Sequence, residues 1–330
     1  MNDAATVGLA LVIPTHNRSA YIGETLEHAL RQSVAFSEII VVDDGSTDRT
    51  PEILSSFGSR IKAIRQENLG VQVARNAGAA LATSPYITFC DDDDLLGEDY
   101  AKLMSEHLSN HQNVDVVYCN FLLLQDDGST SNKFHYAPKG YFDEAVVEGD
   151  FIVSFPHLIR QTVRFQPLFP TGMTVRKSFY HQIGGFDPKY NRVASEDWEF
   201  TLRAIDRGVV HICTLPLNKV RKHASNNSGN PVRQGVGEAH ILEDALRGIP
   251  SLKAYQPEVL RSIDARRKSS FDAAYANGNF EKCREVDQLL IHADFGGVFR
   301  LKKFIVEMPS PLREWVWKLT QAKGPGNKSR

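Results

Sequence analysis

The chain has 330 residues, of which 38 are Lys or Arg, 40 are Asp or Glu and 42% are hydrophobic. This composition is typical of a globular protein with a large core, and it excludes disordered, collagen-like and small disulfide-stabilised proteins. The formal net charge of −2 argues against a nucleic-acid-binding protein, because such proteins carry a clear basic excess.

The charge is unevenly distributed along the chain. Residues 1–240 contain 22 basic and 29 acidic side chains, whereas residues 241–330 contain 16 and 11. The four cysteines are at least 29 residues apart, so no CxxC metal or redox pair is present. The N-terminus lacks a basic signal-peptide region, and no stretch approaches the roughly 18 apolar residues of a transmembrane helix. We therefore expect a cytoplasmic protein.

Short Val- and Ile-rich runs alternate with segments of helical spacing at the start of the chain, which is typical of a parallel α/β sheet. The predicted strands are Leu9–Ile13, Ile39–Val42, Ile61–Arg65, Tyr86–Phe89 and Val114–Leu122. The predicted helices between them are Ala20–Gln32, Thr50–Phe57, Val71–Leu81 and Asp99–Ser109. Because the strands are continuously apolar, we expect helices to cover both faces of the sheet.

The later parts of the chain follow different patterns. Residues 125–170 mix Gly, Ser, Asp and aromatic residues, which predicts loops and irregular antiparallel pieces. A second ordered block starts at Pro170, with a helix over Ser195–Asp206 and a strand over Val209–Leu215. We expect one α/β domain over 1–230, with halves of about 7–124 and 125–230, and a basic helical extension over 231–330.

Polar clusters follow three predicted strands. They are Pro14-Thr15-His16-Asn17, Asp43-Asp44-Gly45-Ser46 and Asp91-Asp92-Asp93-Asp94. Ligands of open α/β sheets gather at the carboxyl ends of strands, so the clusters should meet at one edge. Four adjacent aspartates repel one another unless a cation lies among them, and all-oxygen ligands favour Mg²⁺ or Mn²⁺. The alternative for this run is a solvated acidic loop that caps the next helix.

The segment around Asp44 has two interpretations. Asp48 can cap a helix whose first turn contains Pro51, which makes the segment a tight turn after a buried strand. A carboxylate here can also accept the imide N–H of uracil or thymine, and Asp44 is the candidate for that role.

Seven motifs in order resemble those of family 2 glycosyltransferases. They are Val12-Ile13-Pro14-Thr15-His16-Asn17-Arg18, Val41-Val42-Asp43-Asp44-Gly45-Ser46-Thr47-Asp48, Ala74-Arg75-Asn76-Ala77-Gly78, Phe89-Cys90-Asp91-Asp92-Asp93-Asp94, Thr171-Gly172-Met173-Thr174-Val175-Arg176-Lys177, Ile183-Gly184-Gly185-Phe186-Asp187 and Glu196-Asp197-Trp198-Glu199-Phe200. The resemblance covers roughly residues 7–225. It implies a GT-A fold, with a Rossmann-like, mostly parallel sheet flanked by helices. It also implies inverting, metal-dependent transfer of a sugar from a nucleotide diphosphate sugar, UDP-sugar first, to a hydroxyl of a glycan or lipid-linked acceptor.

The resemblance also assigns roles to individual residues. The nucleotide-binding residues that it implies are Pro14, which would set the turn, Thr15, Asn17, Asp44, Arg75, Asp91 and Asp92. The implied ligands of Mn²⁺ or Mg²⁺ are Asp91, Asp93 and His223, with the register among the four aspartates open by one residue. Gly172 and Met173 correspond to a loop beneath the donor sugar and the acceptor. A surface salt bridge for Arg75 and an ordinary structural role for His223 are the alternatives.

Glu196 and Asp197 match the family's catalytic acidic pair at the start of a helix. The resemblance implies that Asp197 is the general base that removes the acceptor proton and that Glu196 orients the acceptor. Ser195 is the expected N-cap, and the helix dipole is expected to keep Asp197 ionised at neutral pH. Two acids in an ordinary first helical turn are the alternative.

Other functions stay open at this point. A sugar-nucleotide-binding protein without turnover would keep the same pocket, and a haloacid-dehalogenase-type phosphatase also places acids after a strand. A dehydrogenase is disfavoured because the first strand–helix turn lacks GxGxxG. Residues 297–330 combine eight basic and two acidic side chains with apolar ones. This mixture suits peripheral contact with the cytoplasmic face of a membrane, or helices that fold back on the catalytic domain.

Overall fold

The computed structural model describes residues 7–223, 230–292 and 295–322. Within them, eleven strands form one mixed sheet in the order β3-β2-β1-β4-β10-β6-β11-β9-β8, with β5 paired to β11 and β7 paired to β6. The strands are β1 (Leu9–Thr15), β2 (Glu38–Asp44), β3 (Lys62–Gln66), β4 (Tyr86–Phe89), β5 (Leu95–Leu96), β6 (Val116–Leu124), β7 (Thr130–Asn132), β8 (Val146–Glu148), β9 (Phe151–Ser154), β10 (Met173–Arg176) and β11 (Val210–Arg221).

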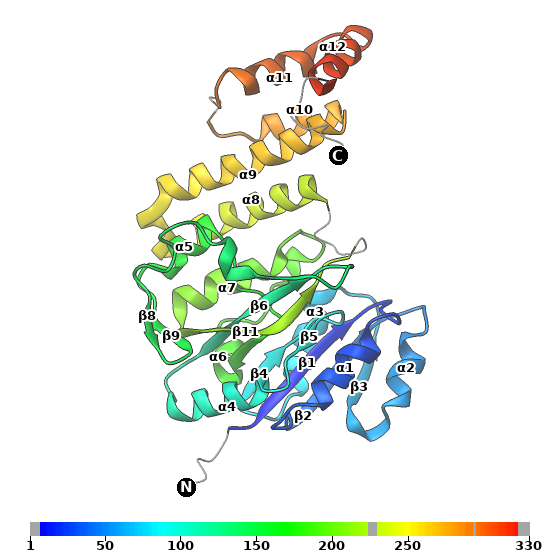
Figure 1. Ribbon diagram of the computed structural model, residues 1–330, viewed down its shortest axis with the longest axis vertical. Helices are drawn as coiled ribbons and strands as arrows, with labels where there is room; N and C mark the ends of the chain where they lie inside the picture. The colour runs from blue at the N-terminus through cyan, green and yellow to red at the C-terminus, as the bar shows by residue number, and fades with distance from the viewer. Residues whose placement is uncertain (1–6, 224–229, 293–294, 323–330) are drawn as a thin grey trace.

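The helices flank the sheet and then continue beyond it (Figure 1). They are α1 (Ile22–Leu30), α2 (Thr50–Ser56), α3 (Val71–Leu81), α4 (Tyr100–Asn110), α5 (Leu158–Arg164), α6 (Lys177–Gln182), α7 (Glu196–Arg207), α8 (Pro231–Gly248), α9 (Gln256–Ala276), α10 (Phe280–Gln288), α11 (Gly297–Glu307) and α12 (Ser310–Ala322). The α/β class and the parallel pairing of β1 with β2 and β4 agree with the sequence prediction.

Alternation along β1 sends its side chains into two separate cores. Ala10 and Val12 pack in the core that α3, α6 and α7 cover. Leu11 and Ile13 pack in the core that α1, α2 and α4 cover. This is the period of two expected for a strand that is buried on both faces. The prediction that helices cover both faces is therefore confirmed for the centre of the sheet.

Three local features differ from the predictions. The predicted strand Ile61–Arg65 becomes β3, whose first residues, Lys62 and Ala63, are exposed because β3 is the last strand at its edge. Pro14 does not set a turn, since it lies inside β1 and pairs with Val42. The turn comes at Asn17, which adopts a φ of 53°.

The region over 125–170 contains the expected antiparallel pieces, β7, β8 and β9. It also contains α5 (Leu158–Arg164), which its short and irregular apolar pattern did not predict. Its buried residues include Leu158 and Ile159, and Ile159 belongs to a core shared with α7, α8 and α9.

The C-terminal helices continue the hydrophobic core of the α/β part. Trp198 of α7 packs in one cluster with Leu242 of α8 and Ile263 of α9. A further cluster joins Phe271 of α9 to Phe299 of α11. The predicted domain boundary at residue 230 adjoins residues outside the described ranges and stays a prediction. In the part of the chain that the structure describes, no helix is both long and apolar enough to cross a bilayer.

Candidate active site

The four aspartates follow β4, beside the carboxyl ends of β1 and β2. Asp92, Asp93 and Asp94 are buried, and only the Asp91 side chain is substantially exposed, at 36%. Three buried carboxyls do not fit a solvated acidic loop, so that alternative is wrong. The predicted meeting of polar clusters at one edge of the sheet is confirmed by the bonds that join them.

Asp92 ties this acidic run to the loop that follows β1. Its carboxylate accepts hydrogen bonds from the backbone N–H of His16 and from Nε of Arg18, each at 3.3 Å. Burial and the neighbouring Asp93 raise the pKa of Asp92 to about 7. Thr15 is also buried here, with its hydroxyl near Asp92. The site therefore holds a carboxyl that titrates near neutral pH.

Asp93 faces a histidine that follows β11. Nε2 of His223 lies 3.0 Å from Oδ2 of Asp93, and the His223 ring stacks on Tyr21 with the centroids 4.7 Å apart. Arg18 approaches the same Asp93 oxygen at 3.6 Å. The structure thus brings together two of the three predicted metal ligands.

Asp94 has a different role. Its carboxylate accepts hydrogen bonds from the Thr171 hydroxyl and from the backbone N–H of Arg221, the latter at 2.9 Å. Burial, with repulsion from Asp93, raises the pKa of Asp94. Asp94 therefore joins β11 and the loop before β10 to the acidic run.

Arg75 of α3 joins the acidic run to the start of α7. Its guanidinium lies 2.7 Å from the Asp91 carboxylate and 3.5 Å from that of Glu196. Burial would lower the pKa of Arg75, but the Asp91 and Glu196 carboxylates outweigh it and raise the pKa above its ordinary value. The side chain is 3% exposed, so the alternative of a surface salt bridge is wrong. Contact with a donor phosphate stays a prediction.

Asp197 lies beside Glu196 in the first turn of α7. Burial and the neighbouring Glu196 raise the pKa of Asp197 to about 7, although Arg75 opposes the shift. Burial likewise raises the pKa of Glu196. The expectation that the helix dipole keeps Asp197 fully ionised at neutral pH is therefore wrong, because loss of solvation outweighs the dipole. A carboxyl with a pKa near 7 is well matched to general-base chemistry at neutral pH.

Ser195 does not cap α7 through its side chain. It adopts a left-handed φ of 62° and makes no capping hydrogen bond. Its hydroxyl instead accepts a hydrogen bond from Nε2 of Gln234 on α8. Ser195 thus occupies the predicted N-cap position without a capping hydrogen bond, and its side chain links the start of α7 to α8.

Asp44 and Asn17 organise the neighbouring loops. The Asp44 carboxylate accepts hydrogen bonds from Nε2 of Gln66 and from the backbone N–H groups of Leu69 and Gly70, at 2.7, 2.9 and 2.8 Å. These bonds, all from residues that the structure describes, occupy three of the about four acceptor positions of a carboxylate. Oδ1 of Asn17 accepts from the backbone N–H groups of Thr47 and Asp48. A tight turn after β2 and a nucleobase contact by Asp44 are both compatible with this geometry.

Asp48 does not occupy the predicted N-cap position of α2, because the cap residue is Arg49. Oδ1 of Asp48 still accepts the backbone N–H of Thr50 at 2.9 Å. Burial would raise the pKa of Asp48, but this and other hydrogen bonds together outweigh burial and lower the pKa.

Gly172 and Met173 have unlike surroundings. Gly172 has a φ of 81°, and a Cβ there would collide with the side chain of Asn218, so this position requires glycine. The Met173 side chain is buried in the core at the start of β10. A contact between the Met173 side chain and a sugar is therefore not supported.

Three basic residues near the site were missed by the sequence analysis. Arg18 reaches Asp92, and Arg221 donates through Nε to the backbone carbonyl of Asp93 at 3.0 Å. The Lys133 amine lies 4.6 Å from the centre of the Phe165 ring, and burial lowers the pKa of Lys133 to about 8. Arg18 lies within the first quoted motif, and Arg221 lies two residues before His223, so both could have been found from the sequence. Nothing in the sequence around Lys133 distinguishes it.

Asp93 and His223 can hold a divalent cation only with help from a ligand. Among the described residues, no three His, Cys, Asp or Glu side chains converge as a complete metal site. Mg²⁺ and related ions are commonly bound by one or two protein groups together with substrate phosphates. The pair therefore fits a metal that arrives with a diphosphate.

Comparisons with known proteins agree with this geometry. Residues 10–168 match the family model described as Glycosyl transferase family 2. Validoxylamine A glucosyltransferase of Streptomyces hygroscopicus subsp. jinggangensis is 44% identical over 221 residues, which cover 61% of this chain and 52% of that protein. Glycosyltransferase GlyG of Streptococcus pneumoniae is 35% identical over 132 residues, which cover 39% and 43%. The chain spans about half the length of these curated relatives.

The fold also matches solved structures. The crystal structure of S. aureus TarS 1-349 in complex with UDP-GlcNAc aligns with a TM-score of 0.59 at 15% identity, covering 97% of this chain and 93% of that chain. The match includes the C-terminal helices as well as the sheet, and it confirms the predicted fold.

Proposed function

We propose that the chain, whose residues 10–168 match the model of glycosyl transferase family 2, transfers a sugar from a UDP-sugar to a hydroxyl group of a glycan or lipid-linked acceptor, with inversion at the anomeric carbon. The observation that carries the proposal is the buried network in which Arg75 joins Asp91 to Glu196. It connects the nucleotide-binding edge of the sheet to the acidic pair at α7. Residues 1–230 would then form the catalytic domain, and 231–330 the helical extension.

Several features favour a UDP-sugar as the donor. One relative is named as a glucosyltransferase, and one structural neighbour was solved with UDP-GlcNAc. Asp44 would offer an acceptor position to an imide N–H, which uracil has and cytosine lacks. Thr15 and Asn17 flank the same edge and would line the base and ribose pocket.

The chain's own groups can carry the proton transfer. Asp197 would accept the proton of the acceptor hydroxyl as its oxygen attacks the anomeric carbon and the bond to the departing diphosphate breaks. Glu196 is held by Arg75 and would orient the acceptor. No second catalytic carboxylate is required on the leaving-group side, because a nucleoside diphosphate is already a good leaving group. Arg18 and Arg221 add positive charge where the diphosphate would lie.

Asp93 and His223 would hold Mn²⁺ or Mg²⁺ together with the donor diphosphate. When bound, the ion would neutralise charge on the leaving diphosphate. Asp91 is held by Arg75, which makes it less suited to the metal than Asp93 and better suited to the ribose side.

A thermal-shift screen of nucleotides with and without Mn²⁺ tests the proposal. We expect UDP and UDP-sugars to raise the melting temperature of the wild type when Mn²⁺ is present, because ligands that bind only the folded state stabilise it. The Asp93→Ala variant should lose the Mn²⁺-dependent part of the shift. Equal shifts with every nucleotide, or none with any, would contradict the proposal.

Two rival functions are distinguished by what the protein makes. The match of residues 10–168 to the family 2 model argues against the first rival, a phosphatase of the haloacid-dehalogenase type. A sugar-nucleotide-binding protein would show the same thermal shift but would release no UDP from a UDP-sugar in the presence of any acceptor. The acidic pair beside Arg75 favours turnover, because binding alone does not require a carboxyl with a pKa near 7.

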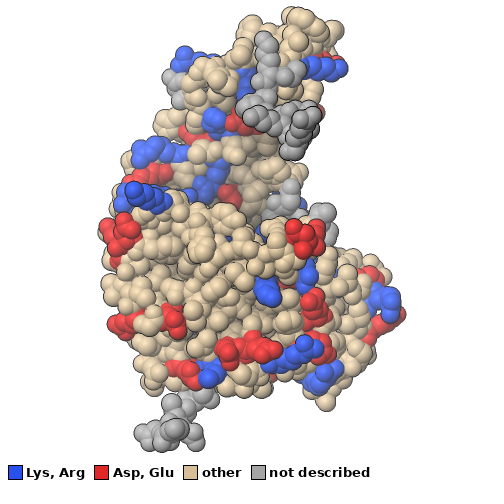
Figure 2. Space-filling view, viewed as in Figure 1, with Lys and Arg blue, Asp and Glu red and all other residues tan. Residues whose placement is uncertain are grey.

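The proposal includes contact of the C-terminal helices with an anionic membrane. Phe299 and Ile305 of α11 are buried against α9 and α10, which belong to the helical extension itself, so this packing does not bear out the alternative that these helices fold back on the catalytic domain. Phe304 of α11 and Trp315 of α12 are 65% and 62% exposed. Basic side chains are visible over the same end of the molecule (Figure 2). Exposed aromatic groups among cations are typical of a surface that lies at a lipid interface.

Flotation with vesicles tests the membrane contact. The full chain should float with phosphatidylcholine vesicles that contain phosphatidylglycerol. The Phe304→Ser/Trp315→Ser variant should bind at least about tenfold more weakly, since burying each such side chain contributes about 1.5–3 kcal/mol. Tyr136→Ser/Val147→Ser, at exposed positions of the α/β part, is the control. If the Phe304→Ser/Trp315→Ser variant and the control float equally, the proposed membrane contact is wrong.

A further inference from the structure

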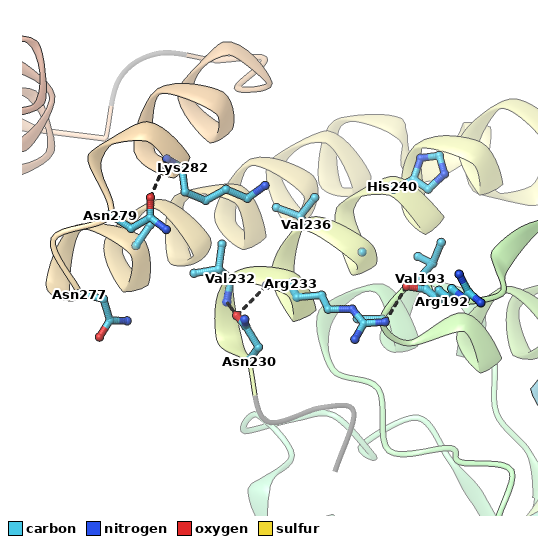
Figure 3. Close-up of a pocket in the computed structure, with 13 residues that line it drawn as sticks. Arg192, Val193, Asn230, Val232, Arg233, Val236, His240, Asn277, Asn279 and Lys282 are labelled. Carbon is cyan, nitrogen blue, oxygen red and sulfur yellow. Dashed lines mark hydrogen bonds between the residues drawn. The ribbon is translucent and has the colours of Figure 1, made fainter. Parts of the chain in front are cut away.

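A pocket of about 590 Å³ lies between the α/β part and the C-terminal helices (Figure 3). Its walls come from the segment before α7, from the first turns of α8, and from the junction of α9 with α10. The lining residues are Arg192, Val193, Ala194, Asn230, Val232, Arg233, Val236, Gly237, His240, Ala274, Asn277, Asn279 and Lys282. None of the sequence motifs pointed to this pocket.

The lining has a positive electrostatic character. It includes three basic side chains, Arg192, Arg233 and Lys282, and no carboxylate. In the described ranges, no carboxylate lies within ion-pair distance of Arg192 or Arg233, whereas Lys282 pairs with Glu285 at 2.6 Å. The chain as a whole has a net charge of −2, so this concentration of cations is a local feature.

Two helices begin at the same pocket. Oδ1 of Asn230 accepts the backbone N–H groups of Val232 and Arg233 at the start of α8, and Oδ1 of Asn279 accepts that of Lys282 at the start of α10. The positive ends of both helix dipoles therefore add to the charge of the side chains. Val232, Val236 and Ala274 supply apolar surface between the polar groups.

The pocket adjoins the catalytic turn. Ala194 lines it and is followed directly by Ser195, Glu196 and Asp197. Nε2 of Gln234, on the helix that carries Arg233, donates to the Ser195 hydroxyl. Arg233 itself donates to the backbone carbonyl of Arg192 at 2.7 Å. The pocket therefore shares a wall with the segment that leads into the turn carrying the proposed base.

We propose that this pocket is an acceptor subsite and that it binds an anionic group, phosphate or carboxylate, carried by the acceptor glycan. The inference rests on the proposed function, because it takes Asp197 as the base that the acceptor must reach. The cations would hold the anionic group, the valines would contact sugar or alkyl carbons, and the adjoining hydroxyl would be presented to Asp197. An acidic acceptor is thus selected by a surface separate from the one that binds the donor diphosphate.

Binding of polyanions to the full chain tests this subsite. The probes are inorganic polyphosphate, polygalacturonate and, as a neutral polymer, dextran. We expect polyphosphate or polygalacturonate to bind and dextran not to bind, and the preferred polymer identifies phosphate or carboxylate as the anionic group. Arg192→Gln/Arg233→Gln/Lys282→Gln should weaken that binding at least about tenfold, with the melting temperature followed to verify folding. Arg49→Gln/Lys62→Gln/Lys102→Gln removes the same charge from exposed positions elsewhere and should have little effect.

A second variant tests the pocket without changing its charge. Val236→Trp fills the space between the cations and should also weaken polyanion binding. Equal weakening by the pocket triple and the control triple, or strong binding that Val236→Trp leaves unchanged, would overturn the inference. The UDP-dependent thermal shift is measured on the same samples. If that shift persists while the polyanions fail to bind, the acceptor subsite is wrong and the proposed donor function stands; if the shift is absent, the donor function has failed.

Discussion

Replacing Asp197 with asparagine is expected to lower the rate of sugar transfer by about 10²–10⁴, because general-base assistance contributes about that much. The amide has nearly the shape of the carboxyl but cannot take the acceptor proton. Binding of UDP should stay near the wild-type level, since Asp197 is proposed to act on the acceptor. The measurement is the rate of UDP release in the presence of acceptor, together with the UDP thermal shift.

The same substitution should not destabilise the protein. Burial raises the pKa of Asp197 to about 7, well above its ordinary value, so the folded state disfavours the ionised form. This cost is absent at low pH, grows as pH rises toward 7, and is fully present above it. At pH 8 the neutral amide avoids the cost, and the melting temperature of the Asp197→Asn variant should equal or exceed that of the wild type. A variant that loses activity only because it unfolds would contradict this account.

The pH profile gives an independent measure of the base. Transfer by the wild type should rise with pH through an apparent pKa near 7, because the base must lose its proton first. Glu196 and Asp197 are adjacent and interact, so the apparent pKa belongs to the pair. Residual transfer by the Asp197→Asn variant should lack this rise. A flat wild-type profile between pH 5 and 8 would contradict the assignment.

Replacing Arg75 with methionine is expected to have the largest effect on stability. The substitution keeps much of the side-chain volume but leaves the Asp91 and Glu196 carboxylates without their shared cation. Removing one partner of a fully buried ion pair costs about 3–5 kcal/mol. Because the Asp91 side chain is 36% exposed, we expect a decrease of at most that size in the free energy of unfolding, with loss of transfer. Chemical denaturation at pH 8 measures the first effect.

Two further variants show whether charge causes the effect. Arg75→Met/Glu196→Gln removes one of the uncompensated carboxylates and should recover part of the lost stability. Arg49→Gln is the exposed control, with 80% of the Arg49 side chain accessible, and should change the free energy of unfolding by less than about 0.5 kcal/mol. No recovery in the double variant would show that Arg75 acts through packing and not through the Asp91 and Glu196 charges.

The sequence predicted the sheet well where local pattern and burial agree. Tyr86–Phe89 and Val71–Leu81 have the predicted bounds, because an apolar run or a helical stripe ends there at turn residues. At β3 the strand itself was predicted within one residue, but its burial was not, because position at the sheet edge, and not local pattern, decides exposure. Helix α5 was missed because its burial depends on contacts with distant helices.

The sequence predicted which residues form the candidate site more fully than it predicted their burial and their charged neighbours. The motifs identified Asp91, Asp93 and Asp197, and the structure places the elements that carry them at connected positions. The role of Arg75 between two carboxylates could not be deduced, because Asp91 and Glu196 are 105 residues apart in the sequence. The pKa near 7 of Asp197 also depends on burial that only the folded chain provides. The pocket beside α8 is likewise assembled from three distant segments.

A crystal structure of the protein with UDP and Mn²⁺ tests the central claim most directly. Anomalous scattering locates the manganese ion, and we predict it between the Asp93 carboxylate and Nε2 of His223, with diphosphate oxygens completing its coordination and the uracil ring near Asp44. UDP bound elsewhere on the molecule, or a manganese ion coordinated by neither Asp93 nor His223, would contradict the account.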